Sequence, residues 1–158
     1  MGAVFFCDGV TSYTHGAVPE RVVCSLKERC DEQIVALEML AVVFALLAFL
    51  PHLADRAVRI WVDNAAAECI LKRGSAASSD HNWICHEIWT LCFKHKIGLW
   101  VERVSSDDNV ADEPSRRKFD VVGELGKEVA VPACTSDVLW NFCCVAIGRL
   151  KGCGDRHL

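Results

Sequence analysis

Three acidic residues stand where a purely structural role is hard to give to all of them at once. Glu38 lies inside the strongly apolar segment IVALEMLAVVFAL, where an unpaired carboxylate is costly to bury. Asp63 directly follows the apolar run VRIWV, and Asp112 lies in the segment NVADEPSRR. Each has an ordinary explanation when taken alone: Glu38 could be protonated or turned to a wet edge, and the two aspartates could favour helix starts.

The three carboxylates gain a chemical meaning if folding brings them together. Like charges at close range repel one another unless a divalent cation lies between them. Hard oxygen ligands suit Mg²⁺ or Mn²⁺, and two such ions about 3.5–4 Å apart can activate water and stabilise the leaving oxygen of a phosphodiester. We therefore take Glu38, Asp63 and Asp112 as candidate metal ligands and catalytic residues.

The elements that must position these residues follow from periodicity and capping signals. The long apolar segment predicts a helix from an N-cap at Asp31 to about Leu50, where Pro51 stops it. Residues Val58–Val62 and Ile97–Val104 are rich in β-branched and aromatic side chains and predict buried strands. Asp63 thus follows a strand, at the edge of an α/β sheet where functional groups collect.

Further helices are predicted between and after these strands. Asn64 can cap a short helix that ends at Gly74, and Asp80 can cap another that reaches about Lys96. A last short helix is expected over Val110–Lys118. Near the start of the chain, residues 1–7 predict a strand closed by an Asp-Gly turn, and residues 21–26 a second, weak strand. Strands that alternate with helices predict an α/β layered domain.

The length and composition of the chain set limits on its class. The 158 residues are enough for about one domain, and 52% hydrophobic residues provide ample apolar surface to offset the entropy of ordering. The net charge of −4 means that no global positive field attracts nucleic acid, so any such contact must be local. We expect residues 1–118 to form the domain and residues 119–158 a C-terminal extension, with a packing helix over 136–150 and a frayed tail.

The cysteines and the N-terminal segment favour an intracellular protein, cytoplasmic or nuclear and not secreted. Ten cysteines occur without any C-x-x-C pair, so we expect reduced and mostly buried thiols in place of a structural zinc site. The N-terminus lacks the basic region of a signal peptide. The apolar run Met39–Leu50 is shorter than the roughly 20 residues that span a bilayer, so no membrane contact is expected.

Three strings in order along the chain carry a family resemblance. They are QIVALEMLAVVFAL, then RIWVDNAAAECILKRGSAASSDHNWICHEIW, then LWVERVSSDDNVADEPSR. Together they resemble the ribonuclease H domain of retroelement reverse transcriptases, especially those of DIRS-like elements. The motif positions that hold the family's catalytic Glu and two of its Asp residues are occupied here by Glu38, Asp63 and Asp112. The similarity covers roughly residues 1–118.

The resemblance implies a fold, an activity and a partner. The fold is ribonuclease H-like: a five-stranded mixed β-sheet flanked by α-helices. The activity is Mg²⁺- or Mn²⁺-dependent hydrolysis of the RNA strand of an RNA–DNA hybrid, as part of a retroelement reverse transcriptase whose polymerase region would lie upstream. The hybrid would be held through its backbone geometry, because no base-reading motif is present.

The chain departs from the family at its N-terminus. The family's first strand ends in a further catalytic Asp and is followed by a second strand that resembles GAVLF. Here GAVFF occupies residues 2–6, so the alignment places the first strand upstream of Met1 and leaves a gap or an exposed edge in the sheet. A rival alignment makes FFCD, ending at Asp8, the first strand and GAVPERVV the second, which places Pro19 inside a strand.

Three other classes of function remain open from the sequence. The first is a catalytically inactive retroelement remnant or nucleic-acid-binding module on the same fold. The second is an integrase or transposase core, although that family places its Glu after the strand Asp, whereas Glu38 precedes Asp63. The third is a membrane peptide or anchor.

Overall fold

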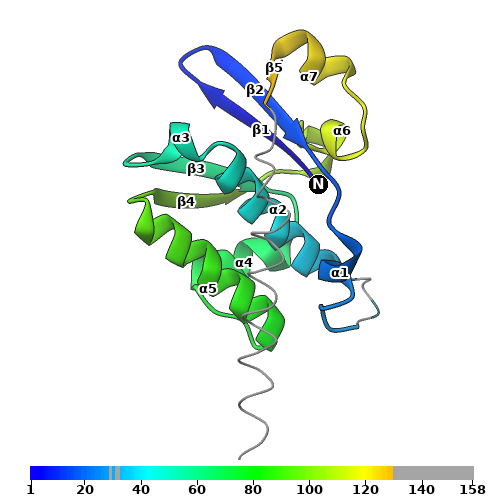
Figure 1. Cartoon of the computed structure of the whole chain (residues 1–158), viewed down its shortest axis with the longest axis vertical. Coiled ribbons are helices and arrows are strands. Elements are labelled where there is room, and N and C mark those ends of the chain that lie inside the picture. The colour runs from blue at the N-terminus through cyan, green and yellow to red at the C-terminus, as the bar shows by residue number, and fades with distance from the viewer. Residues whose placement is uncertain (29, 31–32, 130–158) are drawn as a thin grey trace, which may run out of the picture.

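Two small β-sheets and a layer of helices make up the computed structural model, which describes residues 1–28, 30 and 33–129 (Figure 1). The elements in chain order are β1 (Gly2–Cys7), β2 (Val10–His15), α1 (Glu20–Val23), α2 (Ile34–Ala48), α3 (Leu50–Leu53), β3 (Ala57–Val62), α4 (Ala65–Arg73), α5 (Ser79–Lys94), β4 (Gly98–Arg103), the 3₁₀ turn η1 (Ser106–Asp108), α6 (Asp112–Ser115), α7 (Asp120–Leu125) and β5 (Lys127–Glu128). The expected packing helix 136–150 and tail lie outside the described residues.

The first sheet is built on a hairpin. Strands β1 and β2 pair antiparallel from Gly2 opposite His15 to Cys7 opposite Val10. Asp8 and Gly9 form the turn with positive φ angles of 49° and 77°, a conformation that Asp and Gly tolerate better than most residues. The short strand β5 pairs parallel with β2, so the sheet is mixed.

The second sheet consists of β3 and β4, which pair in parallel over six residues each. Their inner residues alternate with exposed ones: Val62 and Val101 are buried, whereas Trp61 and Trp100 are largely exposed. This alternation is the pattern of strands with one covered face. The parallel connection runs through α4 and α5, as a parallel pair requires.

The α/β class is confirmed, but the described strands do not form the single five-stranded sheet that the resemblance implies. They form two sheets, because β1 and β3 are not paired with each other. The rival alignment is wrong: residues 16–23 form no strand and include α1, while Val10–His15 is the partner of β1. The weak strand predicted at 21–26 is likewise wrong.

Helix α2 is apolar on all sides and packs against β1, α4 and α5. It begins at Ile34, after the left-handed residue Gln33, while the predicted N-cap Asp31 lies outside the described residues. Pro51 falls in the first turn of α3, where its missing N–H costs little. Within the described ranges no helix, α2 included, has the length and apolar character needed to cross a membrane.

Local signals in the sequence explain α4 well and the later helices less well. The Asn64 side chain accepts hydrogen bonds from Ala66 N and Ala67 N, both at 3.0 Å, and Gly74 closes the helix in the left-handed conformation, as predicted. Helix α5 begins at Ser79, one residue before the predicted cap Asp80. The helix predicted over 110–118 is the single turn α6.

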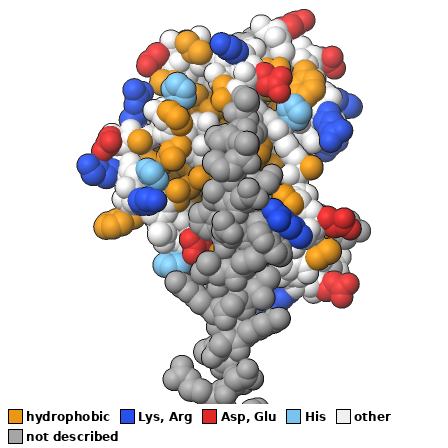
Figure 2. All heavy atoms as spheres, viewed as in Figure 1, with side chains coloured by type: hydrophobic (Ala, Val, Ile, Leu, Met, Phe, Trp, Pro, Cys, Tyr) orange, Lys and Arg blue, Asp and Glu red, His pale blue; other side chains and the backbone are white. Residues whose placement is uncertain are grey.

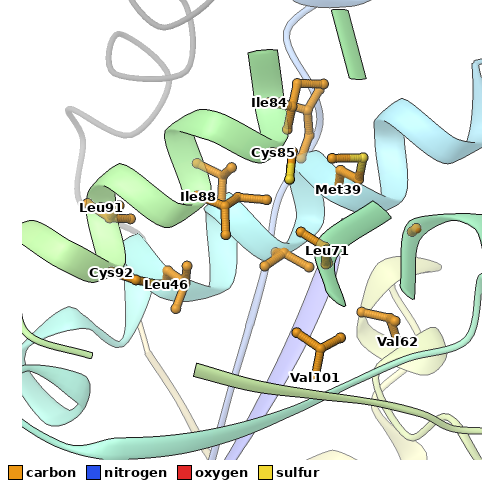
Figure 3. Close-up of a cluster of buried hydrophobic side chains, with 14 of the residues drawn as sticks. Met39, Leu46, Val62, Leu71, Ile84, Cys85, Ile88, Leu91, Cys92 and Val101 are labelled. Atoms are coloured by element: carbon orange, nitrogen blue, oxygen red, sulfur yellow. The ribbon is translucent and has the colours of Figure 1, made fainter. Parts of the chain in front are cut away.

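The core joins helices to both strands of the second sheet. Figure 3 shows side chains from α2, α4 and α5 turned toward one another and toward Val62 and Val101. Among the six described cysteines, Cys85 and Cys92 are buried in this core, but Cys24, Cys30 and Cys69 are exposed. The expectation of mostly buried thiols is therefore wrong for those three. Burial raises the pKa of Cys92 to about 11, which makes it an inert thiol.

Two substitutions in α5 test this core. Ile88 is fully buried, so we expect Ile88→Ala to lower the free energy of unfolding by about 2–5 kcal/mol in urea titrations. Phe93 in the same helix is 88% exposed, so Phe93→Ala should change it by less than about 0.5 kcal/mol. Similar losses for both variants would contradict the assignment of the buried face.

Candidate functional site

Glu38 lies on α2 among apolar neighbours and is only partly buried. Its pKa is raised above the ordinary carboxyl value, first by burial, then by the negative charge of Asp63 and then by that of Asp112. The Met1 ammonium group acts in the opposite direction and lowers it. Glu38 therefore lies within electrostatic reach of both other candidate acids and of the chain's amino terminus.

Asp63 follows the last residue of β3 and precedes the cap of α4. Its Oδ2 accepts a hydrogen bond of 3.0 Å from Nδ2 of Asn109. The carboxylate is thereby fixed at the carboxyl end of β3 by a residue 46 positions later in the chain. Asp63 belongs to the site by position, and Asn109 determines the orientation of its side chain.

Asp112 is the first residue of α6. Its Oδ2 forms an ion pair of 2.8 Å with the Arg116 guanidinium, which lies one turn further along the chain. Ser115 Oγ donates a hydrogen bond of 2.8 Å to the backbone carbonyl of Asp112. The ion pair is exposed, with 66% of the Arg116 side chain accessible. Such surface pairs contribute only about 0–1 kcal/mol, so little free energy holds the Asp112 carboxylate in this position.

Asn109 is a residue of the site that the sequence pattern did not indicate. Besides its bond to Asp63, its side-chain oxygen accepts from Ala111 N at 3.2 Å, and its backbone carbonyl accepts from Asp112 N at 3.0 Å. One residue therefore connects the end of β3 with the start of α6. The signal was present in the string NVAD, but an amide side chain in a polar loop has no charge that would draw attention to it.

Met1 is the second group that sequence reasoning missed. Its amino group donates to the Gly16 carbonyl at 2.8 Å, and burial lowers its pKa while Glu38 raises it. Figure 1 shows the N-terminus beside α6. A β carbon on Gly2 would lie 2.4 Å from Ser115 N and 2.7 Å from Ala111 O, so the start of β1 touches α6 closely.

Asp8 lies away from the three acids. It sits in the turn after β1, and its carboxylate accepts a hydrogen bond from the Cys7 thiol at 3.3 Å. The six residues of β1, at about 3.4 Å each, separate this turn by roughly 20 Å from the end of the strand near Glu38. Asp8 therefore takes no part in the site.

Glu38 and Asp63 line one cavity of about 550 Å³ together with Asn109. The cavity runs between β1 and β3, with α2 along its side. Arg56 lines its opposite end, where its guanidinium lies 3.7 Å from the Cys7 sulfur. Acidic groups thus occupy one end of the cavity and a basic group the other.

The chemistry of this donor set suits a hard divalent cation, but the present orientations do not form a complete site. Among the described residues, no three His, Cys, Asp or Glu side chains are arranged to hold one metal ion. Asp63 is bound to Asn109 and Asp112 to Arg116. Glu38 feels the charge of each of the two aspartates, but the three side chains would have to reorient before they could share an ion.

Comparison with known proteins gives no relative: no protein-family model, curated protein or solved structure matches the chain.

The raised pKa of Glu38 predicts how stability depends on pH. The folded state holds the Glu38 proton more tightly than the unfolded chain does, so this residue lowers stability as pH rises from its ordinary pKa through its raised one. We expect Glu38→Gln to remove this loss, so that the variant melts above the parent protein at pH 7 and the difference shrinks as the pH falls toward the ordinary pKa of a glutamate.

The exposed Glu20 provides the matched control for this substitution. Melting curves of Glu20→Gln should follow those of the parent protein at every pH between 4 and 8. A Glu38→Gln variant that melts at or below the parent temperature at pH 7 would show that the Glu38 carboxylate is not destabilised by its surroundings.

Proposed function

We propose that the protein is a metal-dependent endonuclease of the ribonuclease H type, which hydrolyses the RNA strand of RNA–DNA hybrids as part of a retroelement reverse transcriptase. The observation that carries this proposal is that Glu38 and Asp63 line one cavity together with Asn109, which bonds to the side chain of Asp63 and to the backbone N–H of Asp112. The three acidic residues come from helix α2, the end of β3 and the first turn of α6, which are far apart in the sequence. A nuclease site of the kind that the sequence motifs predict requires these three residues to lie near one another.

The three acids would bind the metal ion, and Asn109 would position one of them. An Mg²⁺ or Mn²⁺ ion held by Glu38, Asp63 and Asp112 would supply Lewis-acid stabilisation of the charge that develops on a phosphodiester. A metal ion binds the ionised carboxylate and the raised pKa of Glu38 favours its proton, so binding should weaken at acidic pH. Asn109 would hold Asp63 in place through the bond between their side chains.

Binding of the hybrid would rest on local basic groups, since the chain as a whole is acidic. Figure 2 shows that Lys and Arg side chains on the viewed face include a group at the margin near α3 and the beginnings of β3 and β4. At the site itself, Arg116, Arg117 and Lys118 are exposed directly after α6. On this proposal, these three cations would contact phosphates near the acidic residues.

Cleavage of a labelled RNA–DNA hybrid tests the proposal directly. We expect the protein to cut the RNA strand in millimolar Mg²⁺ or Mn²⁺, and Asp63→Asn to lower the rate by at least about 100-fold, because it removes a charge from the site. Asp107→Asn, an exposed aspartate in η1, should leave the rate unchanged. Absence of cleavage with either ion would refute the nuclease assignment.

A second candidate function is a metal-free module that binds nucleic acid on the same fold. The observation that favours it is the Arg116–Asp112 ion pair, which neutralises one of the three acids without a metal ion. Among the described residues, no group of three Asp, Glu, His or Cys side chains is arranged so that it could bind a metal ion. On this alternative, the basic residues after α6 would bind phosphates and the acids would be structural.

Melting curves with and without Mg²⁺ distinguish the two candidates. For the nuclease, Mg²⁺ at ten times its Kd should stabilise the folded protein by about 1.4 kcal/mol, and Asp63→Asn should abolish this gain. Arg116→Gln should enlarge the gain, because Asp112 is released and a positive charge is removed. Lys118→Gln, which removes an exposed charge without a bond to Asp112, is the control. If Mg²⁺ leaves the melting temperatures of both the parent protein and Arg116→Gln unchanged, the result would favour the metal-free module.

A further inference from the structure

The second sheet has one covered face and one open face. Helix α4 packs against both β3 and β4, and the inward side chains Val62 and Val101 belong to the core. On the opposite face, Trp61 and Trp100 are 50% and 65% exposed. Parallel strands in α/β proteins are almost always covered on both faces, so an open face with two large aromatic side chains indicates an interaction surface.

Four outward side chains form one connected group on this face, which we call the tryptophan face. In the register of the two strands, Arg59 lies beside Trp100, and Trp61 lies beside Glu102. The four residues thus occupy the corners of a small rectangle, with the indoles on one diagonal and the charged groups on the other. Because the two charges have opposite signs, the tryptophan face as a whole is neutral.

Contacts within the tryptophan face hold its side chains in place. The Arg59 guanidinium lies 5.8 Å from the centre of the Trp61 ring, and its Nε lies 3.7 Å from Glu102 Oε1. Trp100 Nε1 donates a hydrogen bond of 3.1 Å to the same oxygen of Glu102. Both indoles are therefore positioned before a partner arrives, which lowers the entropic cost of binding.

The chemistry of the tryptophan face favours a protein partner over a nucleic acid. Trp and Arg are among the residues that most often dominate the energetics of protein interfaces. A strand of nucleic acid needs a net positive surface for its phosphates, whereas Glu102 here balances the charge of Arg59. Glu102 also accepts the hydrogen bond of the Trp100 indole, so it lies at the centre of the group.

The arrangement of the charges is complementary to itself. A two-fold axis in the plane of the face, along the line through the two indoles, brings each charged corner close to the oppositely charged corner of a second copy. Arg59 of each copy then meets Glu102 of the other, as the isologous contact of a two-fold dimer requires. The strands of the two copies cross steeply in this arrangement, which resembles the orthogonal packing of sheets.

We propose that the tryptophan face is the interface of a homodimer, in which two copies pack face to face and Arg59 of each copy pairs with Glu102 of the other. Trp61 and Trp100 supply the apolar contact. Two strands of six residues make a small interface, so the dimer forms reversibly. The dimer does not depend on the proposed nuclease activity.

Sedimentation velocity of the full chain tests the dimer. The measurement covers about 1–200 µM, the range in which small interfaces associate. A reducing agent prevents disulfides between exposed cysteines of two copies. We expect the average mass to rise toward that of a dimer, and Trp100→Ala to raise the Kd at least about tenfold. Phe93→Ala, which removes an 88% exposed aromatic side chain from α5, should leave the Kd unchanged.

Charge reversal tests the pairing between copies. Arg59→Glu gives the face two negative corners and Glu102→Arg gives it two positive ones, so each variant alone should dimerise at least about tenfold more weakly than the parent protein. An equimolar mixture of the two variants should dimerise as the parent does, because opposite charges then meet at both corners. A defect confined to the structure of one chain would not be rescued by mixing.

Three results would overturn the proposal. The first is a parent protein that stays monomeric over the whole range of concentration. The second is a dimer that persists in Trp100→Ala, or a mixture of the charge variants that dimerises no better than each variant alone, since the contact would then lie elsewhere. The third is a monomer whose tryptophan fluorescence is quenched by a single-stranded oligothymidylate in the parent but not in Trp100→Ala, which would assign the face to nucleic acid.

Discussion

Helix α2 has apolar side chains around its whole circumference, and the need to cover it organises the rest of the described structure. Strand β1, α4 and α5 pack against it, and the second sheet contributes Val62 and Val101 to the same core. Glu38 is the one charged residue of this helix. Its carboxylate lines the cavity between β1 and β3, where the cover of α2 is incomplete. The acidic site and this cavity thus have the same origin.

The site depends on the loop between β4 and α6 more than on any regular element. The Asn109 side chain donates a hydrogen bond to Asp63, and its backbone carbonyl accepts one from Asp112 N. Arg116 forms an ion pair with the Asp112 carboxylate. Helix α6 is only one turn long, so packing within it contributes little order. The arrangement of the acids therefore rests on a few polar contacts at the surface, and a bound cation could change it at small cost.

The sequence was informative wherever the structural signal was local. The cap at Asn64, the left-handed Gly74, the strands β3 and β4 and the turn at Asp8 follow from residue type and pattern alone. The pairing of strands that lie far apart in the chain could not be predicted as well from the sequence. The separation into two sheets depends on whether β1 and β3 meet, and no single segment encodes that meeting. Strand β2, with the polar sequence VTSYTH, gave too weak an apolar alternation to be recognised.

In the candidate site, too, some residues could be predicted from the local sequence and others could not. Glu38 and Asp63 could be chosen because a charge inside an apolar run and an acid at a strand end are visible in one dimension. Asn109 and the Met1 amine could not be chosen, because their importance lies in partners 46 and 15 positions away along the chain. Polar partners of this kind are determined by tertiary geometry, which residue patterns do not contain.

The Met1 ammonium group is the positive charge that acts on Glu38, and this has a practical consequence for anyone who prepares the protein. Acetylation of the amino terminus, or a purification tag fused ahead of it, converts this cation into a neutral amide. The acidic end of the cavity then loses the positive charge of the Met1 amine, which burial already weakens by lowering the pKa of that group. Samples with a free and with a blocked Met1 amine therefore differ electrostatically at this end of the cavity, and titrations made on one do not describe the other.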